Sequence, residues 1–220
     1  MSIRRQAQVT FATKILAAAI SYGFAILLAR VMTPEGFGQV AFFLNAAALL
    51  SVVGACGQQI AMIRFVPPLL AWGDRDETLP HMVGIAYCKA IFGAFALFAA
   101  ALGLTAAGFF PRLDPALALM GFALIPAMGW IDIQSHLARG FQRLPLSMIP
   151  KEVLCRGLSG LLIIGAALLS GQPRLPPVAV MAVLLAVLVL LAVAQGAVLL
   201  RQTGFVPGFT QGCNADRMAD

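Results

Sequence analysis

Long apolar runs separated by short polar turns constrain this chain more than any other feature of its sequence. Six runs can be drawn, covering about residues 8–29, 38–60, 82–109, 116–133, 153–169 and 178–200. A helix needs about 20 apolar residues to cross the hydrocarbon core of a membrane, whereas a β-barrel would show alternating segments of about 10 residues. The runs therefore predict an all-α polytopic membrane protein with about six transmembrane helices.

Composition supports a membrane protein. Hydrophobic residues make up 60% of the chain and charged residues 11%, against about 45–50% and about 25% in soluble domains. The net charge of +6 is explained by basic residues between spans, so no nucleic-acid partner is expected. The four cysteines include no C-x-x-C pair, and we expect neither a metal site nor a cofactor.

Lysine and arginine residues in the loops and near the ends of the apolar runs are distributed unequally between the two sides. With a cytoplasmic N-terminus, ten fall on that side (Arg4, Arg5, Arg64, Arg75, Arg139, Arg143, Lys151, Arg156, Arg201 and Arg217). Only Arg30, Arg112 and Arg174 fall on the far side. This positive-inside bias predicts that both termini are cytoplasmic. Residues 1–200 would form the transmembrane lobe, and residues 201–220, which lack periodicity, a disordered tail.

The stretch 29–67 predicts a helical hairpin. Thr33 is a suitable N-cap, Pro34 suits the first helical position, and Glu35 suits the first turn. The second arm is expected to run from Gly38 to Arg64 and to end before Pro67-Pro68, because proline breaks helices. Asp114 and Pro115 provide the same start signal for the fourth span.

Two lysines lie inside apolar runs, where burying a charge is expensive. Lys14 shares one helical face with Ala18, Ser21, Ala25 and Ala29. This stripe of small and polar residues is expected to face protein or a water-filled cavity. Lys89 lies on a similar face of the third span. Both lysines are near the cytoplasmic ends of their spans, so snorkelling to the interface is the alternative.

The end of the fourth span holds a cluster of polar residues. Asp132, Ser135, His136 and Arg139 are spaced i, i+3, i+4 and i+7, hence they share a helical face. Such a cluster could respond to protons or cations and act in coupling or gating. The alternative is an interfacial helix end with solvated charges. The sequence contains no catalytic motif such as G-x-S-x-G, H-E-x-x-H or a P-loop, and we expect no enzyme activity.

A resemblance follows from the hairpin. Its residues L-L-A-R-V-M-T-P-E-G-F-G-Q-V-A-F-F and G-Q-Q-I-A-M-I-R-F-V-P resemble the start of the polysaccharide exporter and O-antigen flippase family. This family belongs to the multidrug/oligosaccharidyl-lipid/polysaccharide flippase superfamily. The segment A-R-G-F-Q-R-L-P-L-S, residues 138–147, is similar to the basic loop after the family's fourth span. The chain resembles only the N-terminal lobe, since family members usually have twelve to fourteen spans in two lobes.

The resemblance implies transport of a lipid-linked oligosaccharide, such as an O-antigen precursor of lipopolysaccharide or another surface polysaccharide, across the bacterial cytoplasmic (inner) membrane. Its pyrophosphate would enter a cavity lined with basic side chains, for which the expected binding residues are Arg30, Arg64, Lys14 and Lys89. Arginine suits this role because it contacts phosphate in bidentate fashion. The partners would be this substrate, membrane lipids, and a second lobe or a second copy. A single lobe is expected to be inactive alone, because alternating access usually needs two repeats.

Two other functions stay open at the level of sequence. One is a cation-coupled multidrug exporter lobe, although basic hairpin ends favour an anionic lipid over a cationic drug. The other is a non-transporting membrane scaffold or an inactive fragment, which the six-span count supports.

Overall fold

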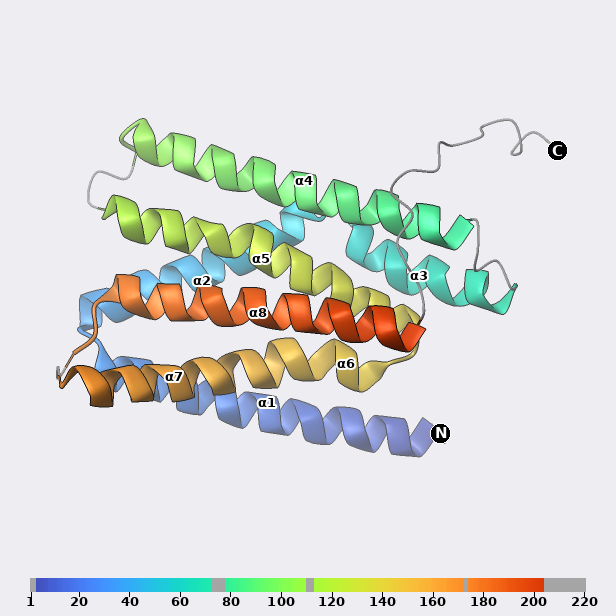
Figure 1. Cartoon of the computed structure of the whole chain (residues 1–220), viewed down its shortest axis with the longest axis horizontal. Coiled ribbons are helices and arrows are strands. Elements are labelled where there is room, and N and C mark those ends of the chain that lie inside the picture. Colours follow the sequence, from blue (N-terminus) through green and yellow to red (C-terminus); the bar gives the residue numbers. More distant parts are fainter. Residues whose placement is uncertain (1–2, 73–77, 110–112, 172–173, 204–220) are drawn as a thin grey trace.

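The computed structural model describes residues 3–72, 78–109, 113–171 and 174–203, and every regular element among them is helical. The helices are α1 (Ile3–Val31), α2 (Pro34–Gly54), α3 (Gln58–Ala71), α4 (Thr78–Ala106), α5 (Pro115–Gly140), α6 (Leu144–Met148), the π-helical segment η1 (Ile149–Leu154), α7 (Cys155–Ser170) and α8 (Pro177–Thr203). Most of the long helices lie along one axis, and successive spans run in opposite directions (Figure 1).

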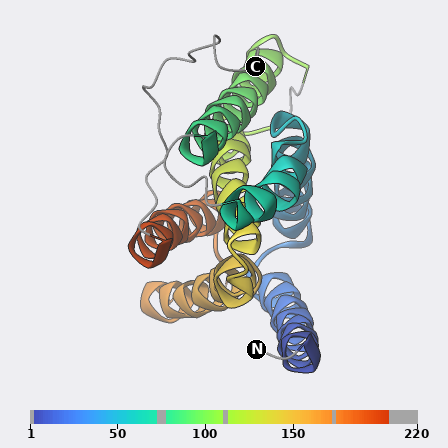
Figure 2. The ribbon, with the colours of Figure 1, turned by 90° about the vertical axis from the view of Figure 1, so that its right-hand side faces the viewer.

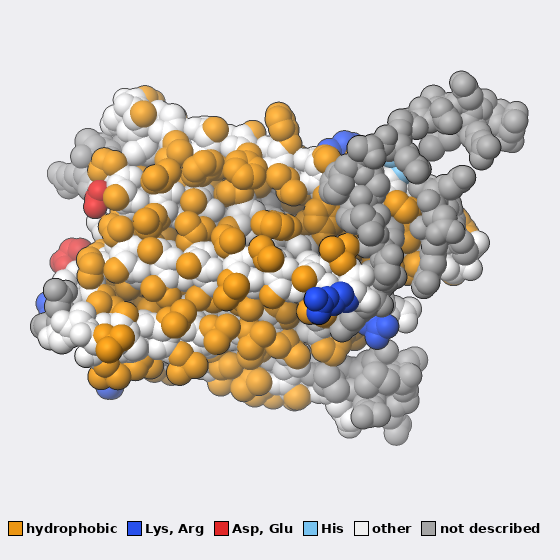
Figure 3. Space-filling view, in the orientation of Figure 1, with side chains coloured by type: hydrophobic (Ala, Val, Ile, Leu, Met, Phe, Trp, Pro, Cys, Tyr) orange, Lys and Arg blue, Asp and Glu red, His pale blue; other side chains and the backbone are white. Residues whose placement is uncertain are grey.

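Six helices are long and apolar enough to cross a membrane among the described residues. They are Thr10–Val31, Pro34–Gly54, Thr78–Ala106, Pro115–Gly140, Leu144–Ser170 and Pro177–Arg201. Large hydrophobic side chains also remain on the outside of the bundle, and Figure 3 shows them across its middle, with charged side chains gathered toward the two ends. Lipid is the natural neighbour of such a surface. The all-α, six-span prediction is confirmed.

The centre of the bundle is α5. It packs against α8, α4, α2 and α3, and it lies between them in the end-on view of Figure 2. In the apolar part of α5, 61% of the residues are buried, compared with at most 39% in the other spans. Phe43 of α2 and Phe122 of α5 meet edge to face, with 5.2 Å between ring centroids. By contrast, α1 lies at the periphery and contacts mainly α7 and η1. Polar residues on α5 are thus placed inside the lobe.

Two helix starts form as predicted from local sequence. The backbone N–H of Gly36 donates to Thr33 Oγ1 at 3.2 Å, and Pro34 occupies the first turn of α2. The backbone N–H of Ala116 donates to Asp114 Oδ1 at 3.0 Å, with Pro115 in the first turn of α5. Both caps satisfy N–H groups that have no partner inside the helix.

The predicted end of the hairpin's second arm is wrong. The helix already stops at Gly54, and the chain turns through Cys56 and Gly57, which have φ of 47° and 77°. The prolines Pro67 and Pro68 instead lie inside α3, near its end. Two prolines so late in a helix remove only two backbone hydrogen bonds, whereas the left-handed conformation at Gly57 redirects the whole chain.

The predicted start of the fifth span at about residue 153 is also wrong, and so is the non-helical stretch expected between the fourth and fifth spans. The fourth span continues to Gly140, only residues 141–143 separate it from α6, and the helical run then continues through η1 to Ser170. Lys151 and Glu152 suggested a loop because they are charged, but both point to partners within the lobe. When these charges are counted as part of a span, Lys and Arg residues are still more numerous on the cytoplasmic side, so the predicted orientation does not change. The predicted tail begins inside α8, and its residues 204–220 lie outside the described part of the chain.

Candidate functional site at a polar junction

The second half of α5 carries polar side chains into the interior of the lobe. Asp132, Gln134 and Ser135 are each at most 4% exposed. Because α5 is surrounded by other helices, these groups cannot reach water by snorkelling. Polar groups in such a place need partners from neighbouring helices.

The π-helical segment η1 provides charged partners on two sides. Lys151 Nζ donates to Asp132 Oδ1 and forms an ion pair with it. The next residue, Glu152, accepts from Lys14 Nζ of α1 at 2.6 Å. Adjacent residues on a helix point in different directions, so η1 presents a cation to α5 and an anion to α1. Short π segments are frequent at functional sites.

Gln195 of α8 connects this helix to α5 and α6 by hydrogen bonds. Its Nε2 donates to the Leu146 backbone carbonyl at 3.1 Å and to Ser135 Oγ at 3.2 Å. The Leu146 carbonyl is available because Pro150, four residues later, has no N–H to donate to it. We call this set of residues the polar junction: Lys14, Asp132, Ser135, Lys151, Glu152 and Gln195. It links α1, α5 and α8 through the α6–η1 segment.

One arginine extends the polar contacts along α1. Arg156 Nη1 donates to Ser21 Oγ, and Ser21 in turn donates to the Ala17 carbonyl at 2.5 Å. Ser21 belongs to the predicted stripe that includes Lys14. The other stripe residues, Ala18, Ala25 and Ala29, are exposed, while α1 buries Ala17, Phe24 and Leu28. The stripe therefore borders the packed face of α1 and leaves its small side chains accessible.

The predicted cluster at the end of the fourth span is only partly assembled. The carboxylate of Asp132 pairs with Lys151, while His136 Nδ1 lies 2.7 Å from the Asp132 backbone carbonyl. Arg139 Nε donates to Ser147 Oγ at 2.8 Å. Sequence reasoning missed Lys151, Glu152, Arg156 and Gln195 as members of a site. The available signal was three charges within six residues, of which Lys151 and Glu152 were expected before the fifth span and Arg156 near its start.

The four predicted binding residues are not gathered in one cavity. Arg30 is exposed at the end of α1, and Arg64 is exposed on α3, with its guanidinium 5.5 Å from the Phe65 ring centroid. Lys89, exposed on α4, lines a small pocket of about 360 Å³ against α3. Only Lys14 joins the polar junction. No described residues form a group of three His, Cys, Asp or Glu side chains suited to a metal ion.

Comparison with known proteins identifies the family. The family profile described as "polysaccharide biosynthesis protein" matches residues 3–212. Neither the curated proteins nor the solved structures include a significant match. The matched range covers all six candidate spans, and it confirms the resemblance to polysaccharide exporters that the hairpin indicated. This chain belongs to the polysaccharide biosynthesis protein family and is a multi-pass membrane protein of the polysaccharide-transporter type.

Proposed function

We propose that this chain forms one lobe of a flippase that moves a lipid-linked oligosaccharide, the precursor of a surface polysaccharide, across the bacterial cytoplasmic membrane. The face formed by α1 and α7 borders the transport path, and Arg156 is the residue that contacts the substrate's phosphates. A second lobe, from another chain or a second copy, closes around this face. The lobe is inactive alone.

The position of Arg156 is the observation that best supports this proposal. Its guanidinium is bonded to Ser21, which lies near the middle of the 22-residue span Thr10–Val31, about 15 Å from either end at about 1.5 Å per residue. Arg156 is exposed on the lobe. A charge at this depth facing lipid would cost about 2.5–3.5 kcal/mol or more. An aqueous cavity or a second lobe is the environment that avoids this cost, and transporters bind substrate near this depth.

The chemistry of the face suits a bulky anionic headgroup. A guanidinium forms two parallel hydrogen bonds to phosphate oxygens, and the neutral Ser21 hydroxyl leaves the charge of Arg156 uncompensated. The small residues of the α1 stripe leave room for sugars to pass. Lys14 adds a second cation nearer the N-terminal end of α1, with its charge balanced by Glu152. We expect Arg30, Arg64 and Lys89 to act at the entrance and exit of the path.

The Asp132–Lys151 ion pair argues against the multidrug alternative. A cation-coupled exporter needs a carboxylate that can take up a proton or a metal cation. Asp132 is 4% exposed and already neutralised by Lys151, so a cation would have to displace a lysine. The basic, accessible face on α1 and α7 favours an anionic substrate instead.

Complementation tests the proposal. In cells that lack only this chain, Arg156→Gln should reduce surface polysaccharide at least about tenfold, because the loss of one charge-assisted phosphate contact costs about 1.5–3 kcal/mol. Arg156→Lys should restore part of the export, and Arg174→Gln, between α7 and α8, should match the unmodified chain. Protein levels in the membrane are compared by immunoblot. Normal export by Arg156→Gln at a normal protein level would remove Arg156 from the path. Full export by the unmodified chain without any second lobe would contradict the single-lobe proposal.

A further inference from the structure

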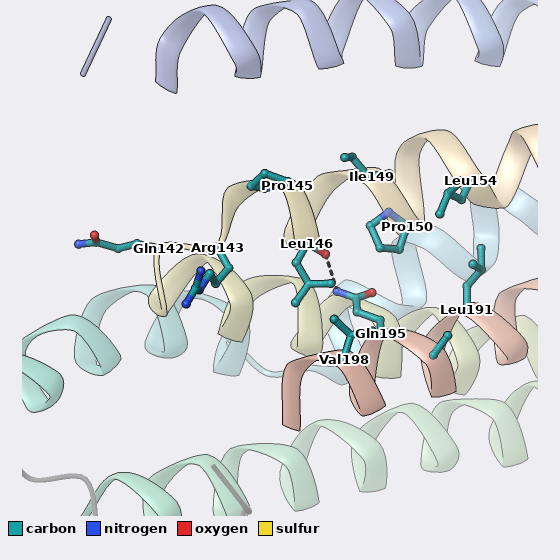
Figure 4. A pocket seen from close by; sticks show the side chains of 11 residues that line it. Gln142, Arg143, Pro145, Leu146, Ile149, Pro150, Leu154, Leu191, Gln195 and Val198 are labelled. Atoms are coloured by element: carbon teal, nitrogen blue, oxygen red, sulfur yellow. Dashed lines mark hydrogen bonds between the residues drawn. The ribbon is translucent and has the colours of Figure 1, made fainter. Parts of the chain in front are cut away.

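The proposed function makes no use of a groove on the side of the α6–η1 segment that faces α8. It lies between this segment and α8, has a volume of about 610 Å³, and is shown with its lining side chains in Figure 4. Ile149, Leu154, Leu191 and Val198 supply apolar walls, and Arg143 stands at one end. The walls belong to candidate membrane spans, so lipid hydrocarbon is the medium next to the groove.

The groove contains a polar atom that lacks a partner. Gln195 is 2% exposed, and its Oε1 receives no hydrogen bond from the described residues. The orientation of the amide is fixed, since the Leu146 carbonyl can only accept and therefore requires the Nε2 side. Figure 4 shows Oε1 on the side of Gln195 away from Leu146, toward Pro150 and Leu191. A ligand with a hydroxyl donor would satisfy this oxygen, which otherwise carries the cost of an unmade hydrogen bond.

The charged end of the groove indicates an anion. Arg143 is exposed, and no carboxylate lies within ion-pair distance of it in the described ranges. Arg143 is the residue immediately before α6, and Leu146, whose carbonyl accepts a hydrogen bond from Gln195, lies in the first turn of that helix. Arg143 and Gln195 line the same groove, so a phosphate and a headgroup hydroxyl of one lipid can contact both side chains. An acidic headgroup beside a basic residue at the membrane surface gains binding energy as well.

We propose that this groove binds an acidic phospholipid with a hydroxylated headgroup, of the phosphatidylglycerol class. Arg143 binds the phosphate, Gln195 Oε1 accepts a hydrogen bond from a headgroup hydroxyl, and an acyl chain lies along the apolar walls. The bound lipid contacts α8 and the α6–η1 segment at once and so supports the polar junction from its lipid side. Binding of this lipid does not depend on which substrate the lobe transports.

Native mass spectrometry of the purified full chain tests this site. The chain is mixed with phosphatidylglycerol, phosphatidic acid and phosphatidylcholine of identical acyl chains, and the lipids that stay bound are counted. Phosphatidylglycerol should be retained about fivefold more than phosphatidylcholine, as expected for one arginine near an anionic headgroup. Phosphatidic acid should fall between them, because it keeps the net negative charge of the headgroup but lacks the glycerol hydroxyls. Equal retention of all three lipids would overturn the proposal.

Variants locate the binding to the groove. Arg143→Gln should lower phosphatidylglycerol retention to the phosphatidylcholine level, whereas Arg201→Gln, an exposed arginine on the last turn of α8, should not change it. Ala194→Trp fills the groove without removing any bond of Gln195 and should abolish the preference. Ala197→Trp, on exposed α8 surface outside the groove, is the matched control. Equal lipid retention by the two tryptophan variants contradicts the site. A lipid-free dimer that Ala194→Trp dissociates would assign the groove to a second copy instead and equally overturn the proposal.

Discussion

Asp132 and Lys151 form an ion pair whose two members differ in exposure. The side chain of Asp132 is 6% exposed and that of Lys151 is 41% exposed. If Asp132 loses its charge, Lys151 can turn toward the surface. If Lys151 loses its charge, the carboxylate stays inside the lobe with nothing to balance it, which is the costly case for a buried pair.

The two halves of this pair should therefore respond differently to mutation. Lys151→Met is expected to lower the free energy of unfolding by about 3–5 kcal/mol, and Asp132→Asn by about 1 kcal/mol, since the amide still accepts a hydrogen bond. The double variant should recover most of the loss. Unfolding of the detergent-purified chain, followed by tryptophan fluorescence, measures these values.

Lys89→Met is the control for this comparison, because Lys89 is an exposed lysine on a candidate span that makes no ion pair within the described residues. It should change stability by no more than about 0.5 kcal/mol. If Lys151→Met and Lys89→Met behave alike, the ion pair does not hold the junction together.

At the scale of helices, α2 and α4 approach each other through two glycines. A Cβ placed on Gly93 would clash with the Gly54 backbone carbonyl, and a Cβ on Gly54 would lie 2.9 Å from the Ala94 backbone nitrogen. Both obstacles are backbone atoms, which cannot move aside by changing rotamer. Small residues at helix crossings allow this kind of contact in membranes, and here the contact lies where α2 ends.

This crossing predicts a contrast between two glycines of α4. Gly93→Ala should destabilise the lobe by about 1–3 kcal/mol, because it forces the helices apart. Gly103→Ala should be neutral or slightly stabilising, because nothing lies within 4 Å of its Cβ position and alanine favours helix. Thermal unfolding of the two purified variants in the same detergent gives the comparison. Equal unfolding temperatures would mean that α2 and α4 do not pack through glycine.

The π-helical segment η1 determines toward which neighbouring helices its charged side chains point. Cys155 N–H bonds back to the Pro150 carbonyl, five residues earlier, as a π-helix requires. The extra residue in this turn shifts the face that η1 presents to its neighbours relative to a continuous α-helix. Pro150 accounts for the irregularity, and its missing N–H also frees the Leu146 carbonyl for Gln195. One proline thus shapes both the junction and the groove.

At the scale of the whole molecule, the turns between spans gather at two ends. In Figure 1 the C-terminal ends of α1, α4 and α7 lie at the left, while the N-terminal end of α1, the α5–α6 turn and the end of α8 lie at the right. The positive-inside bias assigns the right-hand end to the cytoplasm. The orientation itself remains a prediction from charge.

Cysteine labelling tests this orientation. In a chain without its four native cysteines, single cysteines replacing Gly108 or Gly171 should react with a membrane-impermeant maleimide added to intact cells with a permeable outer membrane. A cysteine replacing Gln142, in the α5–α6 turn, should react only after the inner membrane is opened. All three positions are exposed. Labelling of the Gln142 position in intact cells would reverse the orientation and place both ends of the bundle on the opposite sides.

The sequence by itself determined the number of spans, the helix starts at Thr33 and Asp114, and the family. These depend on local hydrophobicity, on capping within one turn, and on a contiguous motif. The polar junction is different because it joins residues that are distant in sequence: Lys14 and Glu152 are 138 residues apart, and Ser21 and Arg156 are 135 apart. No periodicity encodes such pairs. Whether a charge beside an apolar run lies in a loop or inside the lobe was decided by the tertiary structure, because burying it requires a partner from another helix.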